Sequence, residues 1–280
     1  MASRIEPLSA GVDIAPRRDV YDRSSLMGDF MIVIEGQTED DYWRRRPDDQ
    51  FCEYFDGLIY FHPPKNMTED ELAASRGIYD RSSLTGDFLV ILEDQTSEDF
   101  ELYAPENKYC DYLEGRVYMP SPVSSRHQEH VGFFHTLIDL FREPRGGWSL
   151  LFGPAVLRID EEHKPEPDLF VVPLHRSEGD PPAALVIEIL SSSNRSHDLV
   201  RKLKVHQDAG IPEIWFVDDR DHVLIVERRE GDSYHREQYA EGVAASSALP
   251  GFWIDVAWLW ADPLPGASGC AQLILASPPA

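Results

Sequence analysis

Two hydrophobic periodicities alternate along the second half of the chain. In "HQEHVGFFHTLIDLFREP", which starts at His127, apolar residues recur at helical spacing and stop before Pro144, so a helix is predicted. A second helix is predicted in "SHDLVRKLKVHQDAG", which ends at Gly210. Short apolar runs typical of buried strands lie between and after these helices: "WSLLF", "DLFVV", "LVIEIL" and "EIWFVDD". The order of helix, three strands, helix and strand predicts an α/β sandwich, with helices flanking a mixed β-sheet.

One of these strands carries an acid among apolar residues. Side chains alternate faces along a strand, so Glu188 in "LVIEIL" shares its face with Val186 and Leu190. A buried carboxylate is costly unless a cation or hydrogen-bond donors compensate its charge. The compensating cation is either a metal ion or a side chain such as Lys202 or Arg201, and the residues alone leave both options open.

The first part of the chain contains a duplication. "YDRSSLMGDFMIVIEGQTEDDY", which starts at Tyr21, recurs as "YDRSSLTGDFLVILEDQTSEDF" from Tyr79, so residues 21–64 duplicate residues 79–122. At the constant offset of 58, 19 of the 44 aligned positions are identical. We expect the first copy to be an appendage within an N-terminal region of residues 1–77, followed by a main domain of residues 78–262. The alternatives are that this copy exchanges into a partner chain or covers the second copy's sheet.

Composition limits the classes of protein to consider. The net charge of −24 disfavours a partner gripped mainly through its phosphates, because such binding draws on Lys and Arg. The three cysteines are too few and too scattered for a disulfide framework or a zinc cluster. No run reaches the roughly 20 apolar residues of a membrane span, and no signal-peptide core is present, so a cytoplasmic protein without a membrane partner is expected. The Pro-, Gly- and Ser-rich residues 263–280 are expected to form a flexible tail.

Polar residues at two strands and one helix suggest a metal site. Asp168 opens the strand "DLFVV" directly after a proline, and Glu188 lies on the following strand. The next helix offers Asp198 and Lys202 on one face, at positions i and i+4. Two carboxylates from adjacent strands, with a cation-bearing helix packed over them, are typical of sites for hard metal ions such as Mg²⁺ or Mn²⁺.

Four segments carry a family resemblance: "GRVYMPSPVSSRHQ", "PEPDLFVV", "LVIEILSSSNRSHDLVRK" and "DAGIPEIWFVD". Together, in this order and spacing, they resemble the Uma-type restriction endonuclease family of the PD-(D/E)XK nuclease superfamily, over roughly residues 96–260. The resemblance implies a restriction-endonuclease-like core of α-β-β-β-α-β order. It also implies a hydrolase that cleaves DNA phosphodiester bonds with Mg²⁺ or Mn²⁺, and it leaves a homodimer open.

The resemblance assigns roles to individual residues. It makes Asp168 and Glu188 the two acids that bind the metal ion and Lys202 the catalytic lysine, although the superfamily usually has its lysine at the position of Leu190. Asp111 stands where the family has glutamate and would be a third metal ligand.

Two further residues are expected beside these ligands. The resemblance implies that His127, and with it Asp198, contacts the metal ligands or a substrate phosphate. His206 stands where the family often has tyrosine.

A second class of function competes with the nuclease. The chain could instead be a catalytically inactive or regulatory relative that acts through protein–protein contacts, which the charge of −24 favours. The presence of Asp168, Glu188 and Lys202 together favours the nuclease. A locally basic rim around Lys202, Arg201 and Lys204 would distinguish the two.

Overall fold

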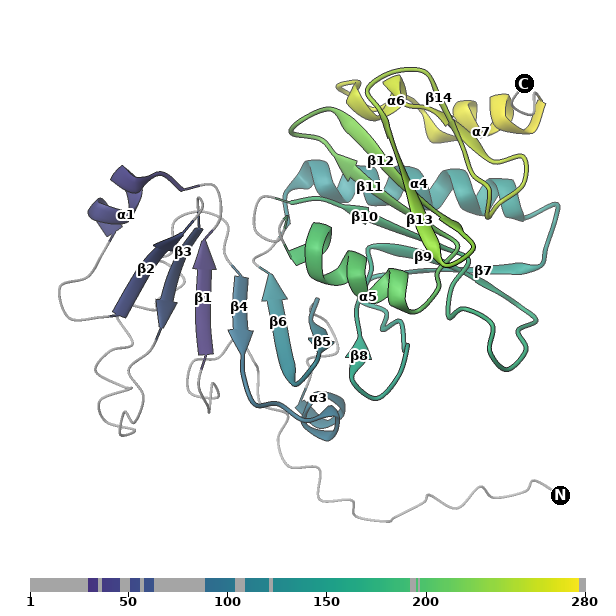
Figure 1. The fold of residues 1–280 in the computed structure, drawn as a ribbon. Coiled ribbons are helices and arrows are strands. Elements are labelled where there is room, and N and C mark those ends of the chain that lie inside the picture. Colours follow the sequence, from purple (N-terminus) through teal and green to yellow (C-terminus); the bar gives the residue numbers. More distant parts are fainter. Residues whose placement is uncertain are drawn as a thin grey trace, which may run out of the picture.

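The described part of the chain forms two large β-sheets. The computed structural model describes residues 30–34, 37–45, 51–55, 58–62, 89–103, 109–120, 123–191, 195 and 197–276. A six-stranded and a seven-stranded sheet lie side by side, the latter at the purple and blue end of the colour scale (Figure 1). A small ribbon pairs β14 (Val243–Ala245) with β15 (Trp253–Asp255).

The six-stranded sheet is mixed. Its strand order is β13-β12-β11-β10-β9-β7, and only the β10–β11 pair is parallel within it. The strands are β7 (Trp148–Phe152), β9 (Leu169–Pro173), β10 (Leu185–Ile189), β11 (Glu213–Asp218), β12 (Val223–Glu230) and β13 (Ser233–Tyr239).

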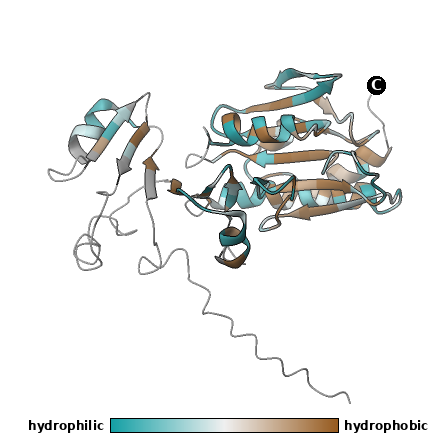
Figure 2. Ribbon diagram, turned by 60° about the horizontal axis from the view of Figure 1, so that its bottom comes forward, coloured by the Kyte–Doolittle hydropathy of each residue, from teal (hydrophilic) through white to brown (hydrophobic). Residues whose placement is uncertain are grey.

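Helices cover both faces of this sheet. Along β10, Ile187 packs into one core cluster with Phe134 of α4 (Ser125–Arg142), whereas Val186 packs into another with Leu203 of α5 (Leu203–Asp208). This alternation is what a strand buried between two helical layers requires. Figure 2 shows the result as brown, hydrophobic stretches along the central strands.

The predicted fold class is confirmed. The elements follow in the order α4, β7, β9, β10, a helical segment ending in α5, and β11, which is the expected α-β-β-β-α-β core around a mixed sheet. The helix α4 begins where Ser124 accepts a hydrogen bond from the His127 backbone N–H at 3.1 Å. Among the described residues, no helix is long and apolar enough to span a membrane.

The expectation of a flexible tail is wrong for most of its length. After α6 (Ala257–Trp260), residues Ala267–Ala276 form the helix α7, whose Ala271 and Ile274 are buried in the core that α4 also lines. The run "CAQLILA" supplies apolar residues at helical spacing, and their burial against α4 outweighs the Pro- and Gly-rich composition around it.

The seven-stranded sheet contains both copies of the duplicated segment. Its order is β2-β3-β1-β4-β6-β5-β8, with every neighbouring pair antiparallel. The first copy supplies β1 (Phe30–Ile34), α1 (Glu39–Arg45), β2 (Phe51–Phe55) and β3 (Leu58–His62). The second supplies β4 (Leu89–Leu92), α3 (Ser97–Tyr103), β5 (Asp111–Leu113) and β6 (Arg116–Pro120), and β8 (His163–Lys164) completes the sheet.

The first copy thus extends the second copy's sheet through β1 and β4. Within the described residues it lies beside that sheet as additional strands and not over its face. The predicted boundary between residues 77 and 78 lies outside the described residues.

Candidate active site

Two buried acids face each other across β9 and β10. The antiparallel register pairs Leu169 with Ile187, which brings Asp168 and Glu188 opposite one another at the end of the ladder. The Asp168 backbone N–H donates to Glu188 Oε2 at 3.3 Å, and the Ile189 N–H donates to Asp168 Oδ2 at 2.7 Å. Both carboxylates are buried, and these two backbone hydrogen bonds between the paired strands hold them close to each other.

Lys202 is the cation that compensates Glu188. Its Nζ lies 2.9 Å from Glu188 Oε1, 3.5 Å from Asp198 Oδ1 and 3.8 Å from Asp111 Oδ1. Burial alone would lower the pKa of Lys202, but these three carboxylates outweigh it and hold that pKa well above its usual range. Lys202 is therefore a charged ammonium ion, and it compensates the charge of Glu188 within the apolar strand β10.

A π-helix turns the polar residues inward. The sequence predicts one continuous α-helix here, but His197–Lys202 form the π-helix η2, which leads into α5. In an α-helix, residues five apart point about 140° away from each other. The wider turn brings His197, Asp198 and Lys202 to the buried side together. The predicted α-helix is thus replaced by a π-helix at the residues that share this site, His197 to Lys202.

Asp111 joins the site from the other sheet. On β5, its carboxylate accepts hydrogen bonds from the Glu166 backbone N–H at 2.7 Å and from His197 Nε2 at 3.0 Å. Burial opposes ionisation, but Lys202 and then His197 lower the pKa of Asp111 to about 2. Burial lowers the pKa of His197, so its neutral ring donates through Nε2. The site thus lies where the two sheets meet.

Two histidines contact the paired acids. His127, at the start of α4, places Nε2 3.2 Å from Asp168 Oδ2, and its predicted role beside a metal ligand stays a prediction. His206 of α5 places Nε2 3.2 Å from Glu188 Oε1 and is fully buried. Sequence comparison marked His206 only as a departure from the family pattern, although its helical spacing of four from Lys202 puts both on one face.

Two residues at the site carry no sequence signal that we recognised. Glu166, two residues before Asp168, is buried and accepts from the Cys110 N–H at 3.1 Å. Burial raises the pKa of Glu166 to about 8, so it is largely protonated at neutral pH. Burial, and after it the charge of Asp168, raises the pKa of Tyr109. The Tyr109 ring also fits against Gly153, where a Cβ would come within 2.2 Å of it.

The donor atoms suit a hard divalent cation. The site gathers the carboxyl groups of Asp111, Glu166, Asp168, Glu188 and Asp198, which offer oxygen ligands of the kind that Mg²⁺ and Mn²⁺ prefer. Burial raises the pKa of Asp198 well above its usual range, against the pull of Lys202. Its buried Oδ1 makes no hydrogen bond to any described residue.

The ammonium group of Lys202, however, occupies the space between these acids. In the part of the chain that the structure describes, no three His, Cys, Asp or Glu side chains converge as a ready metal site. Lys202 lies among Asp111, Glu188 and Asp198. Metal binding would require the lysine to move off Glu188.

The cations expected around the site are largely engaged. Lys202 is buried, and the exposed Lys204 pairs with Asp208 on the same helix. Arg201 is exposed, and its guanidinium carbon lies 5.4 Å from the centre of the Tyr118 ring. A basic rim of three free cations is therefore not observed.

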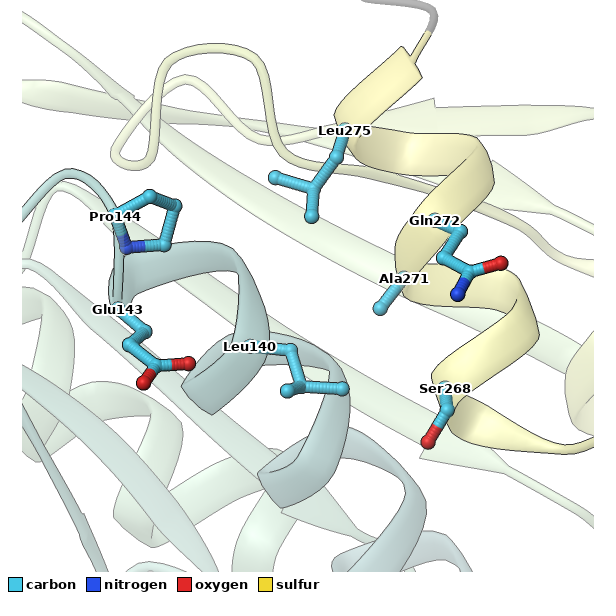
Figure 3. A pocket seen from close by; sticks show the side chains of 7 residues that line it. All are labelled: Leu140, Glu143, Pro144, Ser268, Ala271, Gln272 and Leu275. Atoms are coloured by element: carbon cyan, nitrogen blue, oxygen red, sulfur yellow. The ribbon is translucent and has the colours of Figure 1, made fainter.

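The pocket between α4 and α7 lies apart from these acids. Its volume is about 540 Å³, and its lining consists of Leu140, Glu143, Pro144, Ser268, Ala271, Gln272 and Leu275 (Figure 3). None of the site residues named above lines it.

Comparison with known proteins identifies one family. The Uma2 family model, described as "Putative restriction endonuclease", matches residues 97–257, more than half of the 280 residues, and confirms the predicted resemblance. No curated protein matches the sequence. A solved structure, described as a putative nuclease belonging to DUF820 from Anabaena variabilis ATCC 29413, is 17% identical, with a TM-score of 0.48. That match covers 59% of this chain and 97% of the other.

Proposed function

Because this chain belongs to the Uma2 family, we propose that it is a metal-dependent endonuclease that hydrolyses DNA phosphodiester bonds. The observation that supports this most is the buried cluster in which Lys202 contacts Glu188 and approaches Asp111, with Asp168 across the strand pair. A cluster of buried acids with one lysine is unusual in a fold core, and perturbed groups of this kind concentrate at functional sites.

In this proposal, Asp168, Glu188 and Asp111 hold Mg²⁺ or Mn²⁺. The ion would polarise the scissile phosphate and lower the pKa of a bound water. Asp168 and Asp111 are preset for this role, because backbone N–H groups and histidines fix their carboxylates. Such partners orient ligands before an ion arrives.

Lys202 acts as a cation and not as a base in this proposal. In the metal-free site the neighbouring carboxylates raise the pKa of Lys202 and keep the proton on Nζ, and a protonated Nζ can stabilise negative charge developing on the phosphate. When an ion occupies Glu188, Lys202 would have to turn from that carboxylate towards the substrate. His127 holds Asp168, and we assign it no proton transfer.

A regulatory relative of the nucleases is the second candidate. It is favoured by the net charge of −24 and by the pairing of Lys204 with Asp208, which reduces the positive charge beside the site. In that role, the Lys202–Glu188 pair would be a permanent internal ion pair and the protein would act through protein contacts.

One assay separates the two candidates. Plasmid, linear and single-stranded DNA are incubated with the full chain and Mg²⁺ or Mn²⁺, with Asp168→Asn as the control. Cleavage by the wild type that is lost in Asp168→Asn and in the presence of a chelator supports the endonuclease. Equal, background cleavage by both proteins at every metal concentration would favour the regulatory relative.

A further inference from the structure

The two copies of the duplicated segment are equivalent strand for strand. At the offset of 58 residues, β1, β3 and β2 correspond to β4, β6 and β5. The sheet order places them as β2-β3-β1 and β4-β6-β5, so the strand order of the second copy is the reverse of the first on either side of the β1–β4 pair (Figure 1). Each copy thus presents the same edge strand to the other.

Those edge strands pair as two identical chains would. β1 and β4 are antiparallel, and the register sets Ile32 against its own equivalent, Val90, in the middle of the ladder. Exchanging the copies converts the observed pair of Val33 with Leu89 into the observed pair of Met31 with Ile91. A local two-fold axis therefore passes between Ile32 and Val90, as in a symmetric interface between two copies of one chain.

β4 carries none of the features that protect an exposed edge. Its sequence is "LVIL", and all four residues are buried, Val90 and Leu92 in one cluster and Leu89 and Ile91 in another. Natural edge strands carry charges, proline or bulges that block pairing with other chains. β13, the edge of the other sheet, illustrates this with the polar sequence "SYHREQY". The composition of β4 is therefore that of a strand paired on both sides, as it is between β1 and β6.

Copy one completes a core that copy two cannot close alone. Ile34, Cys52 and Ile59 of the first copy lie in one cluster with residues of β4, β5 and β6 of the second. Without the first copy, one edge and part of both faces of β4 would meet water.

From these contacts we infer that the β4 edge is a self-association edge whose partner is a second copy of the same segment. The first copy is a tethered partner that fills this edge and keeps the chain from pairing with another molecule. In a dimer formed at the vacated edge, the same register would set Val90 of one chain against Val90 of the other.

The test opens the β1–β4 contact in the full chain without altering β4. Val33 is 6% exposed and packs with Leu89 and Ile91, so Val33→Asp places a charge in that apolar cluster and displaces the first copy. Val33→Ala is the matched control, because it removes two methyl groups without adding a charge. Light scattering should give a monomer for the wild type and Val33→Ala and a doubled molar mass for Val33→Asp.

Cysteines introduced one at a time, beside the three buried native ones, test the register. In the Val33→Asp background, Val90→Cys should form a disulfide between two chains, because position 90 lies on the two-fold axis. Leu92→Cys is equally buried on the same face but would meet position 88 of the other chain, so it should crosslink far less.

Three results would overturn the inference. They are a folded Val33→Asp chain that stays monomeric, equal crosslinking at positions 90 and 92, and a wild-type chain with Val90→Cys that already crosslinks. Fluorescence of the buried Trp215 reports whether the six-stranded sheet is intact. If Val33→Asp unfolds it, Met31→Pro opens the ladder without a buried charge. Unfolding by both variants would show that the first copy is integral and not a replaceable partner.

Discussion

The two copies of the duplicated segment have the same local structure. In the first, Thr38 Oγ1 donates to Asp41 Oδ2 at 2.6 Å and accepts from the Asp41 N–H at 3.2 Å. In the second, Thr96 Oγ1 donates to Asp99 Oδ2 at 2.6 Å and accepts from the Asp99 N–H at 3.0 Å. Both are reciprocal caps at the start of a short helix. Similar local sequence has produced the same local hydrogen bonds twice.

The copies differ in what packs against them. Glu53 and Asp111 occupy equivalent positions, yet Glu53 is exposed whereas Asp111 is 5% exposed and bonded to His197. Similarly, Tyr118 is buried with its ring stacked on His197 at 4.3 Å, whereas its equivalent Tyr60 is only half-buried. The comparison teaches that the local sequence sets the hairpin, and that η2, packed against one copy, buries its acid and supplies the hydrogen-bond partner His197.

The largest expected effect comes from removing the cation beside Asp111. Lys202→Met should lower the free energy of unfolding by about 3–5 kcal/mol, because it leaves buried carboxylates uncompensated. Urea denaturation measures this loss. The matched control is Lys204→Met, two residues away and exposed, which should leave stability unchanged. Equal losses for the two variants would contradict the role of Lys202 as the compensating charge.

The equivalent acids provide the second test. If the proposed activity is present, Asp111→Asn should reduce metal-dependent DNA cleavage about 10- to 100-fold, because it weakens a ligand and its bond with His197. Glu53→Gln should leave cleavage unchanged. Melting temperatures of both variants show whether each remains folded. A similar loss from both would mean that the first copy takes part in the chemistry.

The caps should respond alike. Thr96→Ala and Thr38→Ala each remove a capping hydroxyl and should each destabilise their own helix by about 1 kcal/mol. Hydrogen exchange of the α3 and α1 amides reports the two losses separately. The conservative variants Thr96→Ser and Thr38→Ser should recover most of them. A clear inequality would show that the copies differ in local structure as well as in packing.

The smallest effect is the pH dependence of the second cap. The hydrogen bonds from the Thr96 side chain and then its backbone N–H lower the pKa of Asp99 below its ordinary 3.8. The folded chain therefore binds this proton less readily than the unfolded chain, so the cap contributes stability above about pH 4 and loses it as the pH falls. An NMR titration of Asp99 should show the low pKa, and Thr96→Val should raise it. An unchanged pKa in Thr96→Val would show that the hydroxyl is not its cause.

Much of the fold and the central acids could be predicted from sequence. Strand alternation marked Glu188 as an acid in need of a cation, and motif order tied it to Asp168 and Lys202. The structure brings these three together, while their catalytic roles stay predictions. The order of helices and strands was predicted for the same reason, because each element has a clear apolar period.

The rest depended on contacts between distant residues. The π-helix arises because His197 must reach Asp111 on another sheet while Lys202 reaches Glu188, and no helical period encodes that requirement. The buried Glu166 accepts a hydrogen bond from the Cys110 N–H, which lies 56 residues away in the sequence. The Pro- and Gly-rich flanks of the helix α7 give no helix signal, and α7 forms because Cys270, Ala271 and Ile274 are buried in the core that α4 also lines.

The bond between His197 and Asp111 also has a consequence for the order of folding. It joins residues 86 positions apart, whereas the bonds that fix Asp168 and Glu188 span about 20. Long-range contacts form late, because the chain must first close a large loop. The hairpin of β5 and β6 and the strands β9 and β10 can therefore assemble before Asp111 meets η2. We expect the stacking of His197 on Tyr118 to follow these more local pairings, and a chain stalled before that step would lack a complete site.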